Sequence, residues 1–305
     1  MSTRTAPRYS TRELQAAAQA LAAGQFATGS VSTPETTRTV VLDESADAHA
    51  EHRGATVTEP AAAKRVDVTA TAGLGPLVRV RAANAGAGAS TIALALAEVA
   101  DAAGVRTRVL DAAAPGWSGL LGATVTELGA AEGWRRGRRG QGVLIDRVED
   151  VVRVPSDVPI PRSVEGVDLT VLDAGWSMRE LVASETTAWV AAAAAHAEVL
   201  VTRPNALALS QNEAALTHLE DQVAADQVVV VVVGAGRWSD REFATAGRLL
   251  RRAHEQEAVL FAPLLPAKTL PGLGPDPLPK QLTSPSQRLL ERITTITGPL
   301  TANRT

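Results

Sequence analysis

The sequence predicts an α/β protein of three layers, in which a mostly parallel sheet lies between two layers of helices. Short apolar segments, among them residues 77–82 and 228–233, alternate with longer segments of helical periodicity. This alternation is typical of βαβ units. Residues 228–233 are six consecutive valines, which indicates a central strand buried on both faces. The chain has 305 residues, of which 45% are hydrophobic, so it can bury the core that such a fold needs.

The first 70 residues differ from the rest, and we expect a flexible N-terminal arm there. They are rich in Thr, Ser, Ala and Glu and show little apolar periodicity, so they bury too little surface to offset the entropy of ordering. One short helix is predicted at residues 11–23, with Leu14, Ala18 and Leu21 on one face. The arm is either a partner-binding tail or an extension without function. An α/β domain is expected at 76–298, followed by a tail at 299–305.

The first half of the domain is predicted from apolar runs and from the glycines that separate them. We expect a strand at 77–82, a helix at 90–103 that ends before Gly104, and a strand at 105–110. A loop at 112–119 follows, then a helical piece at 120–131 and a basic loop at 133–140. Residues 143–145 and 151–154 are expected to form a hairpin or edge strands.

The second half repeats the alternation of strands and helices. We expect strands at 168–172, 198–202, 228–233 and 258–261, and helices at 184–195, 206–219, 240–254 and 287–296. Ser239 is predicted to cap the helix at 240–254, with Asp240 and Glu242 in its first turn. A proline-rich connection at 266–285 precedes the last helix.

Composition excludes several classes of function. The chain contains no cysteine, so it has neither disulfides nor thiolate metal sites. Its formal net charge is −3, whereas a protein that binds polyanions over its whole surface carries a net positive charge. No apolar run reaches the length of a membrane span, and residues 1–15 are polar, unlike a signal peptide. We therefore expect a soluble, cytoplasmic protein without a transmembrane segment.

The loop between the first strand and the first helix consists of small residues. Such a loop can hold a phosphate group with backbone N–H groups and the N-terminus of the helix. A P-loop has the pattern G-x-x-x-x-G-K-[ST]. The corresponding positions here are Ala83, Gly88, Ala89 and Ser90, so the turn and the hydroxyl are present and the lysine is missing.

Other polar residues follow further strands of the predicted sheet. Asp111 follows the strand at 105–110, Asp173 follows the strand at 168–172, and residues 234–237 follow the six valines. In open α/β sheets ligands bind beyond the carboxyl ends of the strands. We therefore expect these positions and the small-residue loop to form one site.

Together these positions resemble the ParA/MinD branch of P-loop ATPases, including its TadZ-like relatives. Gly86 and Gly88 match glycines of the family's deviant Walker A loop, and Ser90 matches its magnesium-binding hydroxyl. Asp111 matches the first residue of the Asp-x-Asp strand and Asp173 the Walker B aspartate. The resemblance covers residues 76–296 and implies a P-loop NTPase fold, protein partners and a homodimer. It implies ATP or ADP with Mg²⁺ as cofactor, held by Asn84, Ala85, Gly86, Ala87, Gly88, Ala89, Ser90, Thr91, Asp111 and Asp173, with Ser90, Asp111 and Asp173 as the magnesium ligands.

Three residues depart from the family pattern at positions that take part in phosphoryl transfer. Ala89 replaces the P-loop lysine, Asn84 replaces the family's signature lysine, and Ala113 replaces the carboxylate that orients water. Phosphoryl transfer depends mainly on positioning and charge stabilisation, so we expect no catalytic residue and little or no hydrolysis. The resemblance then implies an adaptor or positioning factor in partitioning, conjugation, or a pilus or secretion system. The alternative is a slow Mg-ATP-dependent ATPase of the partitioning type with non-specific DNA binding.

Simpler roles exist for the same residues. Asp111 and Asp173 could only cap turns, and Ser90 could only cap a helix. Arg81 and Arg237 are two candidates to replace the missing lysine. Trp117 and Trp176, in the loops after the two aspartates, either cover the site, form a partner surface or pack in the core.

The densest positive charge lies in the predicted basic loop. Arginine pairs flanked by glycines can bind nucleic-acid phosphates, and a neighbouring indole can stack on a base. The same residues could bind an acidic partner or a lipid surface, or only form a solvated loop. The candidate nucleic-acid or partner residues are Trp134, Arg135, Arg136, Arg138 and Arg139.

Overall fold

A computed structural model describes residues 71, 73–265 and 272–300. The chain divides into two units, Met1–Val57 and Thr58–Thr305, and all described residues belong to the second. The predicted arm with its helix at 11–23 lies outside the described residues. So do residues 266–271 of the proline-rich connection and residues 301–305 of the predicted tail.

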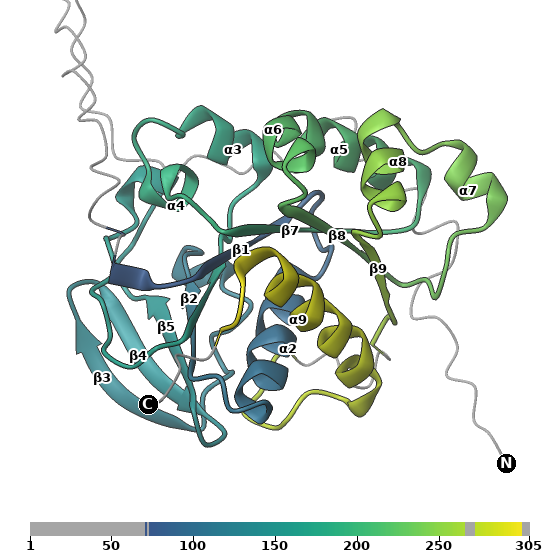
Figure 1. Cartoon of the computed structure of the whole chain (residues 1–305). Coiled ribbons are helices and arrows are strands. Elements are labelled where there is room, and N and C mark those ends of the chain that lie inside the picture. Colours follow the sequence, from purple (N-terminus) through teal and green to yellow (C-terminus); the bar gives the residue numbers. More distant parts are fainter. Residues whose placement is uncertain (1–70, 72, 266–271, 301–305) are drawn as a thin grey trace, which may run out of the picture. The chain divides into compact units, whose positions relative to one another are not determined.

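The second unit contains a nine-stranded sheet within its described residues, in the order β3-β4-β5-β2-β6-β1-β7-β8-β9 (Figure 1). The seven strands from β5 to β9 in this order pair in parallel with one another, and β4 is antiparallel to both β3 and β5. The predicted mostly parallel sheet is therefore confirmed. The strands are β1 (Leu77–Ala82), β2 (Thr107–Asp111), β3 (Thr126–Ala131), β4 (Trp134–Arg139), β5 (Val143–Val148), β6 (Leu169–Asp173), β7 (Ala197–Thr202), β8 (Val228–Val233) and β9 (Val259–Ala262).

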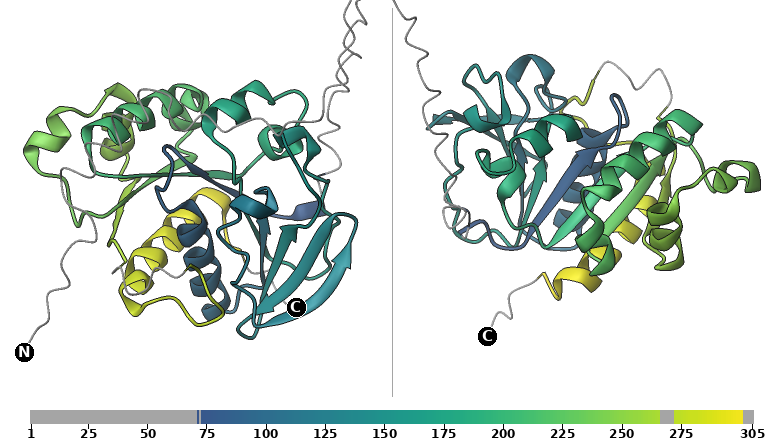
Figure 2. Two further views of the ribbon diagram at one scale, coloured as in Figure 1. Left: turned by 180° about the vertical axis from the view of Figure 1, so that it is seen from behind. Right: turned by 90° about the horizontal axis from the view of Figure 1, so that it is seen from above.

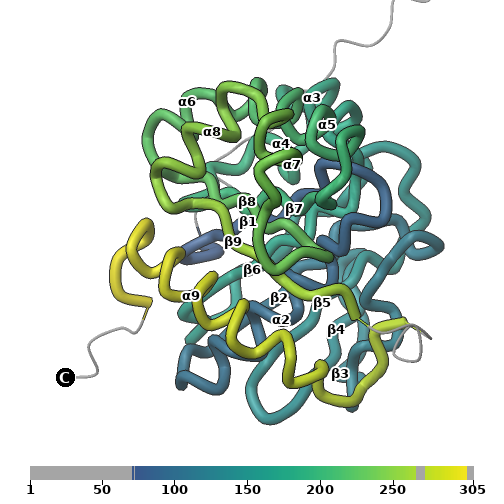
Figure 3. The backbone as a smooth tube through the Cα atoms, turned by 90° about the vertical axis from the view of Figure 1, so that its right-hand side faces the viewer, coloured from purple at the N-terminus to yellow at the C-terminus, as the bar shows by residue number. Residues whose placement is uncertain are grey.

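Helices cover both faces of this sheet, which confirms the three layers. On one face α2 (Ala89–Ala102) and α9 (Thr283–Thr297) lie side by side, and the remaining helices lie on the other (Figures 1 and 2). The tube in Figure 3 shows the same separation from the side. The helices of the second face are α3 (Met178–Ala183), α4 (Trp189–Ala192), α5 (Ala206–Thr217), α6 (Glu220–Ala224), α7 (Asp240–Ala244) and α8 (Arg248–Glu255).

The two faces follow from the alternation of side chains along each strand. In β8, Val229 and Val231 pack in the apolar cluster with α2 and α9, whereas Val230 and Val232 pack in the cluster with α5 and α8. All six valines are buried, as predicted for a central strand. The strand β1 alternates in the same way, with Val78 and Val80 facing α2. Its other residues, Leu77, Arg79 and Arg81, lie on the opposite face.

The sequence prediction was wrong for residues 120–140. Instead of a helix and a basic loop, these residues form the antiparallel strands β3 and β4, joined by the two-residue turn Glu132–Gly133. Both turn residues have positive φ, 53° and 79°, as hairpin turns of this length require. The strand was not recognised because a buried arginine, Arg139, and a half-buried one, Arg136, stand in β4 where apolar residues would mark a strand.

Smaller differences concern helix continuity and one strand. Residues 143–148 form β5, which pairs in parallel with β2, and residues 151–154 form no strand. Within the predicted helix at 184–195 only α4 is an α-helix, and α3 ends just before this range; the predicted helix at 240–254 is interrupted between α7 and α8. Ser239 caps α7 as predicted, with Glu242 completing a capping box. Single turns of 3₁₀ helix occur at Pro115–Trp117, Pro155–Asp157 and Lys280–Leu282.

Candidate functional site

The loop after β1 connects the centre of the sheet to α2. Its first amide, of Ala83, donates a hydrogen bond to the carbonyl of Val201, and the amide of Ala87 donates to the carbonyl of Asn84. Gly86 and Gly88 have positive φ, 69° and 104°, and a Cβ on either would meet no heavy atom within 4 Å. The backbone conformation therefore requires these glycines, and the space beside them is open.

The helix α2 begins at Ala89 with its positive end at this loop. Gly88 is the N-cap residue, no side chain caps the helix, and its first turn contains no acidic residue. The first amide groups of a helix have no partner within it, and the helix dipole favours an anion there. Ser90 lies in the first turn rather than at the N-cap, so the simple capping role is wrong for Ser90.

Two buried aspartates end neighbouring strands at the same edge. Asp111 of β2 lies directly opposite Asp173 of β6 in the register of the sheet, and both side chains are at most 1% exposed. Asp111 accepts hydrogen bonds from the Ser118 hydroxyl and from the Ala113 amide, the latter at 3.2 Å. Asp173 is hydrogen-bonded by the Ser90 hydroxyl, so the structure brings together the three predicted magnesium ligands.

The acid pair, Asp111 and Asp173, forms no ion pair with a described residue, and Arg147, whose charge acts on Asp111, is itself paired with Glu127. Burial raises the pKa of Asp111 to about 6. Burial and the charge of Asp111 raise the pKa of Asp173 to about 7. The Oδ2 atom of Asp173 is buried and has no hydrogen-bond partner among the described residues. Because Mg²⁺ prefers carboxylate and hydroxyl oxygens, Ser90, Asp111 and Asp173 fit this ion, which would supply the missing positive charge.

The loops after β2 and β6 pack closely above the acid pair. Gly175 has φ 69°, and a Cβ there would lie 2.5 Å from the backbone nitrogen of Ala113. The indole of Trp176 donates to the Ala112 carbonyl at 2.8 Å. Gly119 lies against Ser90, because a Cβ on Gly119 would lie 2.6 Å from the Ser90 hydroxyl oxygen. These contacts fix the two loops against each other.

Of the two predicted replacements for the missing lysine, Arg81 is not at the loop in this structure. Arg79 and Arg81 lie on the opposite side of β1, where both bind the buried carboxylate of Glu198. Arg237 is exposed beyond β8. The guanidinium nearest the loop belongs to Arg203, whose Nη2 donates to the Gly86 carbonyl at 2.8 Å. The sequence reasoning missed Arg203, although its position directly after a strand at the same edge was a signal.

The arginines of the predicted basic loop lie in β4, and most of them form ion pairs with carboxylates outside this strand. Arg135 pairs with Glu149, Arg136 with Asp146 and Arg139 with Glu98. Arg138 is exposed and forms no ion pair with a described residue.

Trp134 has a structural role in the same strand. Its side chain is only 6% exposed, its indole donates to the Pro159 carbonyl, and its ring packs against Trp189. Its indole ring is therefore not available to stack on a base. Trp117, by contrast, is 87% exposed in the loop after β2.

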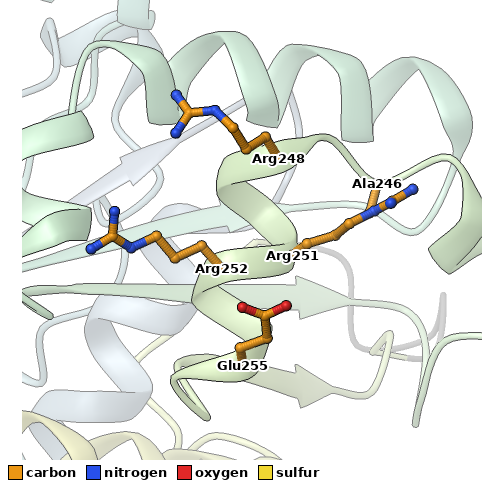
Figure 4. Close-up of a pocket in the computed structure, with 5 residues that line it drawn as sticks. All are labelled: Ala246, Arg248, Arg251, Arg252 and Glu255. Carbon is orange, nitrogen blue, oxygen red and sulfur yellow. The ribbon is translucent and has the colours of Figure 1, made fainter.

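A separate hollow of about 640 Å³ lies along α8 and is lined by Ala246, Arg248, Arg251, Arg252 and Glu255 (Figure 4). Arg248 pairs with Glu220, and Arg251 donates to the Ala244 carbonyl. The three guanidinium groups point in different directions and do not converge on one position. The loop edge, where backbone amides and the acid pair converge, is therefore the stronger candidate site.

Among the described residues, no group of three or more His, Cys, Asp or Glu side chains is arranged to hold a metal. In the same part of the chain, no helix has the length and apolar character needed to cross a bilayer.

Comparison with solved structures identifies the fold. No protein-family model and no curated protein matches the sequence. The septum site-determining protein MinD from Pyrococcus horikoshii, solved with Mg-ADP, matches with a TM-score of 0.50 and 17% identity over 75% of this chain and 99% of that one. The cell division ATPase MinD from Pyrococcus furiosus gives 0.48 and 18% over 73% and 99%. A ParA family ATPase from Chlorobium tepidum gives 0.45 and 12% over 73% and 96%. The fold of this chain is therefore the P-loop NTPase fold of MinD, as predicted.

Proposed function

We propose that this chain is a ParA/MinD-type protein that holds a magnesium nucleotide without efficient hydrolysis and acts as an adaptor or positioning factor. The setting would be a cytoplasmic bacterial assembly for partitioning, conjugation, or a pilus or secretion system, with residues 1–70 as an arm before the domain. The observation that carries the proposal is the combination of a lysine-free phosphate loop with a retained acid pair at the same edge of the sheet.

Binding is supported by the residues that remain. The loop of residues 84–91 offers backbone amides at a helix N-terminus, and Ser90, Asp111 and Asp173 offer oxygen ligands for Mg²⁺. The unpartnered Oδ2 of Asp173 is a buried polar atom, and such atoms are costly unless a ligand satisfies them. The magnesium ion would polarise the phosphate oxygens, and these three residues would hold and orient it.

Weak catalysis is supported by the residues that are lost. In this family's reaction the protein supplies positive charge and a positioned water. Ala89, Asn84 and Ala113 can supply neither. Removal of one such donor typically lowers the rate by about 10²–10³-fold, so the absence of all three leaves little of the rate enhancement.

The adaptor role is supported by the surface beside the site. The loop after β2 exposes Trp117 (87%), Leu121 (63%) and Val125 (63%). Exposed aromatic and apolar side chains of this kind are enriched at protein interfaces. We place the partner surface, or the face of a homodimer, on this loop.

The test combines calorimetric titration of Mg-ADP and Mg-ATP with a phosphate-release assay. We expect the unmodified chain to bind nucleotide and to release phosphate no faster than buffer. The triple variant Asn84→Lys, Ala89→Lys, Ala113→Asp should gain hydrolysis of at least about 100-fold over that background. Turnover by the unmodified chain that is lost in Asp173→Asn would contradict the non-catalytic role.

Turnover that is lost in Asp173→Asn would support the second candidate function, a slow ATPase of the partitioning type. The retained Ser90, Asp111 and Asp173 favour this candidate. Its DNA-binding part is tested separately with Arg138→Ala, because Arg138 is exposed and forms no ion pair with a described residue. Salt-dependent DNA binding that falls in this variant would support a nucleic-acid role. Arg135, Arg136 and Arg139 are unsuitable for this test, since their ion pairs support the sheet.

A further inference from the structure

Arg203 lies over the phosphate loop although it comes from a different part of the chain. It directly follows β7, and its guanidinium binds the Gly86 carbonyl with Nη2 at 2.8 Å and Nε at 3.2 Å. Its third nitrogen, Nη1, forms no hydrogen bond to a described residue and lies 3.8 Å from the position of a Cβ on Gly234. The guanidinium therefore lies between the loops that follow β1 and β8, with one nitrogen unused.

The backbone around Arg203 is held in place on both sides. The hydroxyl of Thr202 is bonded to the Asn84 side chain at 3.3 Å and to the Ala208 carbonyl at 3.2 Å. On the other side, Asn205 caps α5 by accepting a hydrogen bond from the Ala208 amide. The position from which the side chain reaches the loop is therefore fixed by its neighbours.

The charge of Arg203 is not neutralised by any described residue. Its hydrogen bonds go to a carbonyl and not to a carboxylate. Arginines elsewhere in the sheet behave differently, since Arg79 and Arg81 share Glu198, and Arg108 and Arg136 share Asp146. A guanidinium bound only to a carbonyl keeps its positive charge for an anion.

We propose that Arg203 supplies the positive charge that the phosphate loop lacks at Ala89, by binding a phosphate group of the nucleotide over Gly86. The inference rests on the proposed function, because it concerns the same nucleotide site. The positive charge would then come from the residue after β7 rather than from position 89 at the start of α2. Arginine suits this position because its planar group can hold the loop carbonyl with one edge and a phosphate oxygen with another.

The experiment measures the affinity of the full chain for Mg-ATP, Mg-ADP and AMP by calorimetry. Arg203→Gln is the main variant, because its amide can still donate to the Gly86 carbonyl while the charge is lost. We expect Mg-ATP and Mg-ADP to bind about 10- to 100-fold more weakly, and AMP to lose less. Arg203→Lys should retain most of the affinity, since it keeps the charge.

Arg138→Ala is the control, as it removes an exposed arginine from β4, which is separated from β7 by four strands of the sheet, and its affinities should equal those of the unmodified chain. Equal Mg-ADP affinity in Arg203→Gln and the unmodified chain would overturn the role of Arg203 and leave the proposed function intact. An equal loss for all three nucleotides would also overturn it, because that pattern indicates a distorted loop rather than a lost charge. If the unmodified chain binds no nucleotide, the proposed function itself fails.

Discussion

Replacement of Asp173 by asparagine should stabilise the metal-free protein at pH 8. The carboxylate of Asp173 is buried opposite that of Asp111, and its pKa is raised from 3.8 to about 7 by burial first and by the charge of Asp111 second. An acid with a raised pKa in the folded state contributes most stability below its unfolded pKa. That stability is lost as the pH rises through the folded pKa.

The magnitude follows from the shift. A change of one pKa unit is worth about 1.4 kcal/mol, so the rise from 3.8 to about 7 for Asp173 corresponds to roughly 4 kcal/mol at full ionisation. Asparagine removes this charge, keeps an acceptor for Ser90 and can donate to Asp111. We expect Asp173→Asn to gain about 2–4 kcal/mol at pH 8. At pH 5 the gain should fall to about 1–2 kcal/mol, because the folded carboxyl group is protonated there while the unfolded one, with its pKa of 3.8, is already ionised.

The assay is urea unfolding followed by tryptophan fluorescence at pH 5 and pH 8, with EDTA present. Asp276→Asn serves as control, because this carboxylate is exposed and its removal should change little at either pH. Addition of Mg²⁺ at pH 8 should stabilise the unmodified chain and not Asp173→Asn, because only the unmodified chain retains both carboxylates. A variant less stable than the unmodified chain at pH 8 would refute the reasoning.

Two substitutions test the packing that supports the site. Gly175→Ala should cost about 2–4 kcal/mol in urea unfolding, because it adds a collision with Ala113 to an unfavourable φ. Gly86→Ala, with the same φ of 69° and open space, should cost only about 1–2 kcal/mol, and equal costs would contradict the proposed collision. Glu198→Gln should cost about 3–5 kcal/mol, since it leaves two buried arginines without a carboxylate. Glu220→Gln in the exposed pair with Arg248 should cost under about 1 kcal/mol, and the reverse order would refute this argument.

The sequence predicted those parts of the fold in which burial is apolar. Strands β1 and β8 were predicted with their observed bounds, because β8 is an unbroken run of valines and four of the six residues of β1 are apolar. The strand β4 was missed because Arg136 and Arg139 take the place of apolar residues. Their partners, Asp146 and Glu98, are 10 and 41 residues away in the sequence. An arginine whose carboxylate partner is distant in the sequence has the same local sequence pattern as an arginine in a solvated loop.

The sequence predicted only part of the candidate site, because the rest depends on contacts between segments that are far apart in the chain. Asp111 and Asp173 could be assigned to one edge because parallel strands end at the same side of a sheet. Their direct opposition depends on β2 lying next to β6, and strand order is not encoded in the local pattern. Arg203 was missed for the same reason, since its contact with Gly86 spans 117 residues.

The charge distribution at this edge favours binding over catalysis. The acid pair introduces negative charge beneath the site, and Arg203 is the nearest guanidinium to the loop above it. The transition state of phosphoryl transfer requires positive groups around the transferred phosphate, but the loop itself holds Ala89 and Asn84 at the positions of lysines. A magnesium ion on Ser90, Asp111 and Asp173 would balance the acid pair first and leave little charge for the reaction. We therefore expect efficient hydrolysis only with lysine at 84 and 89 together with a carboxylate at 113, since either change alone leaves the other deficit in place.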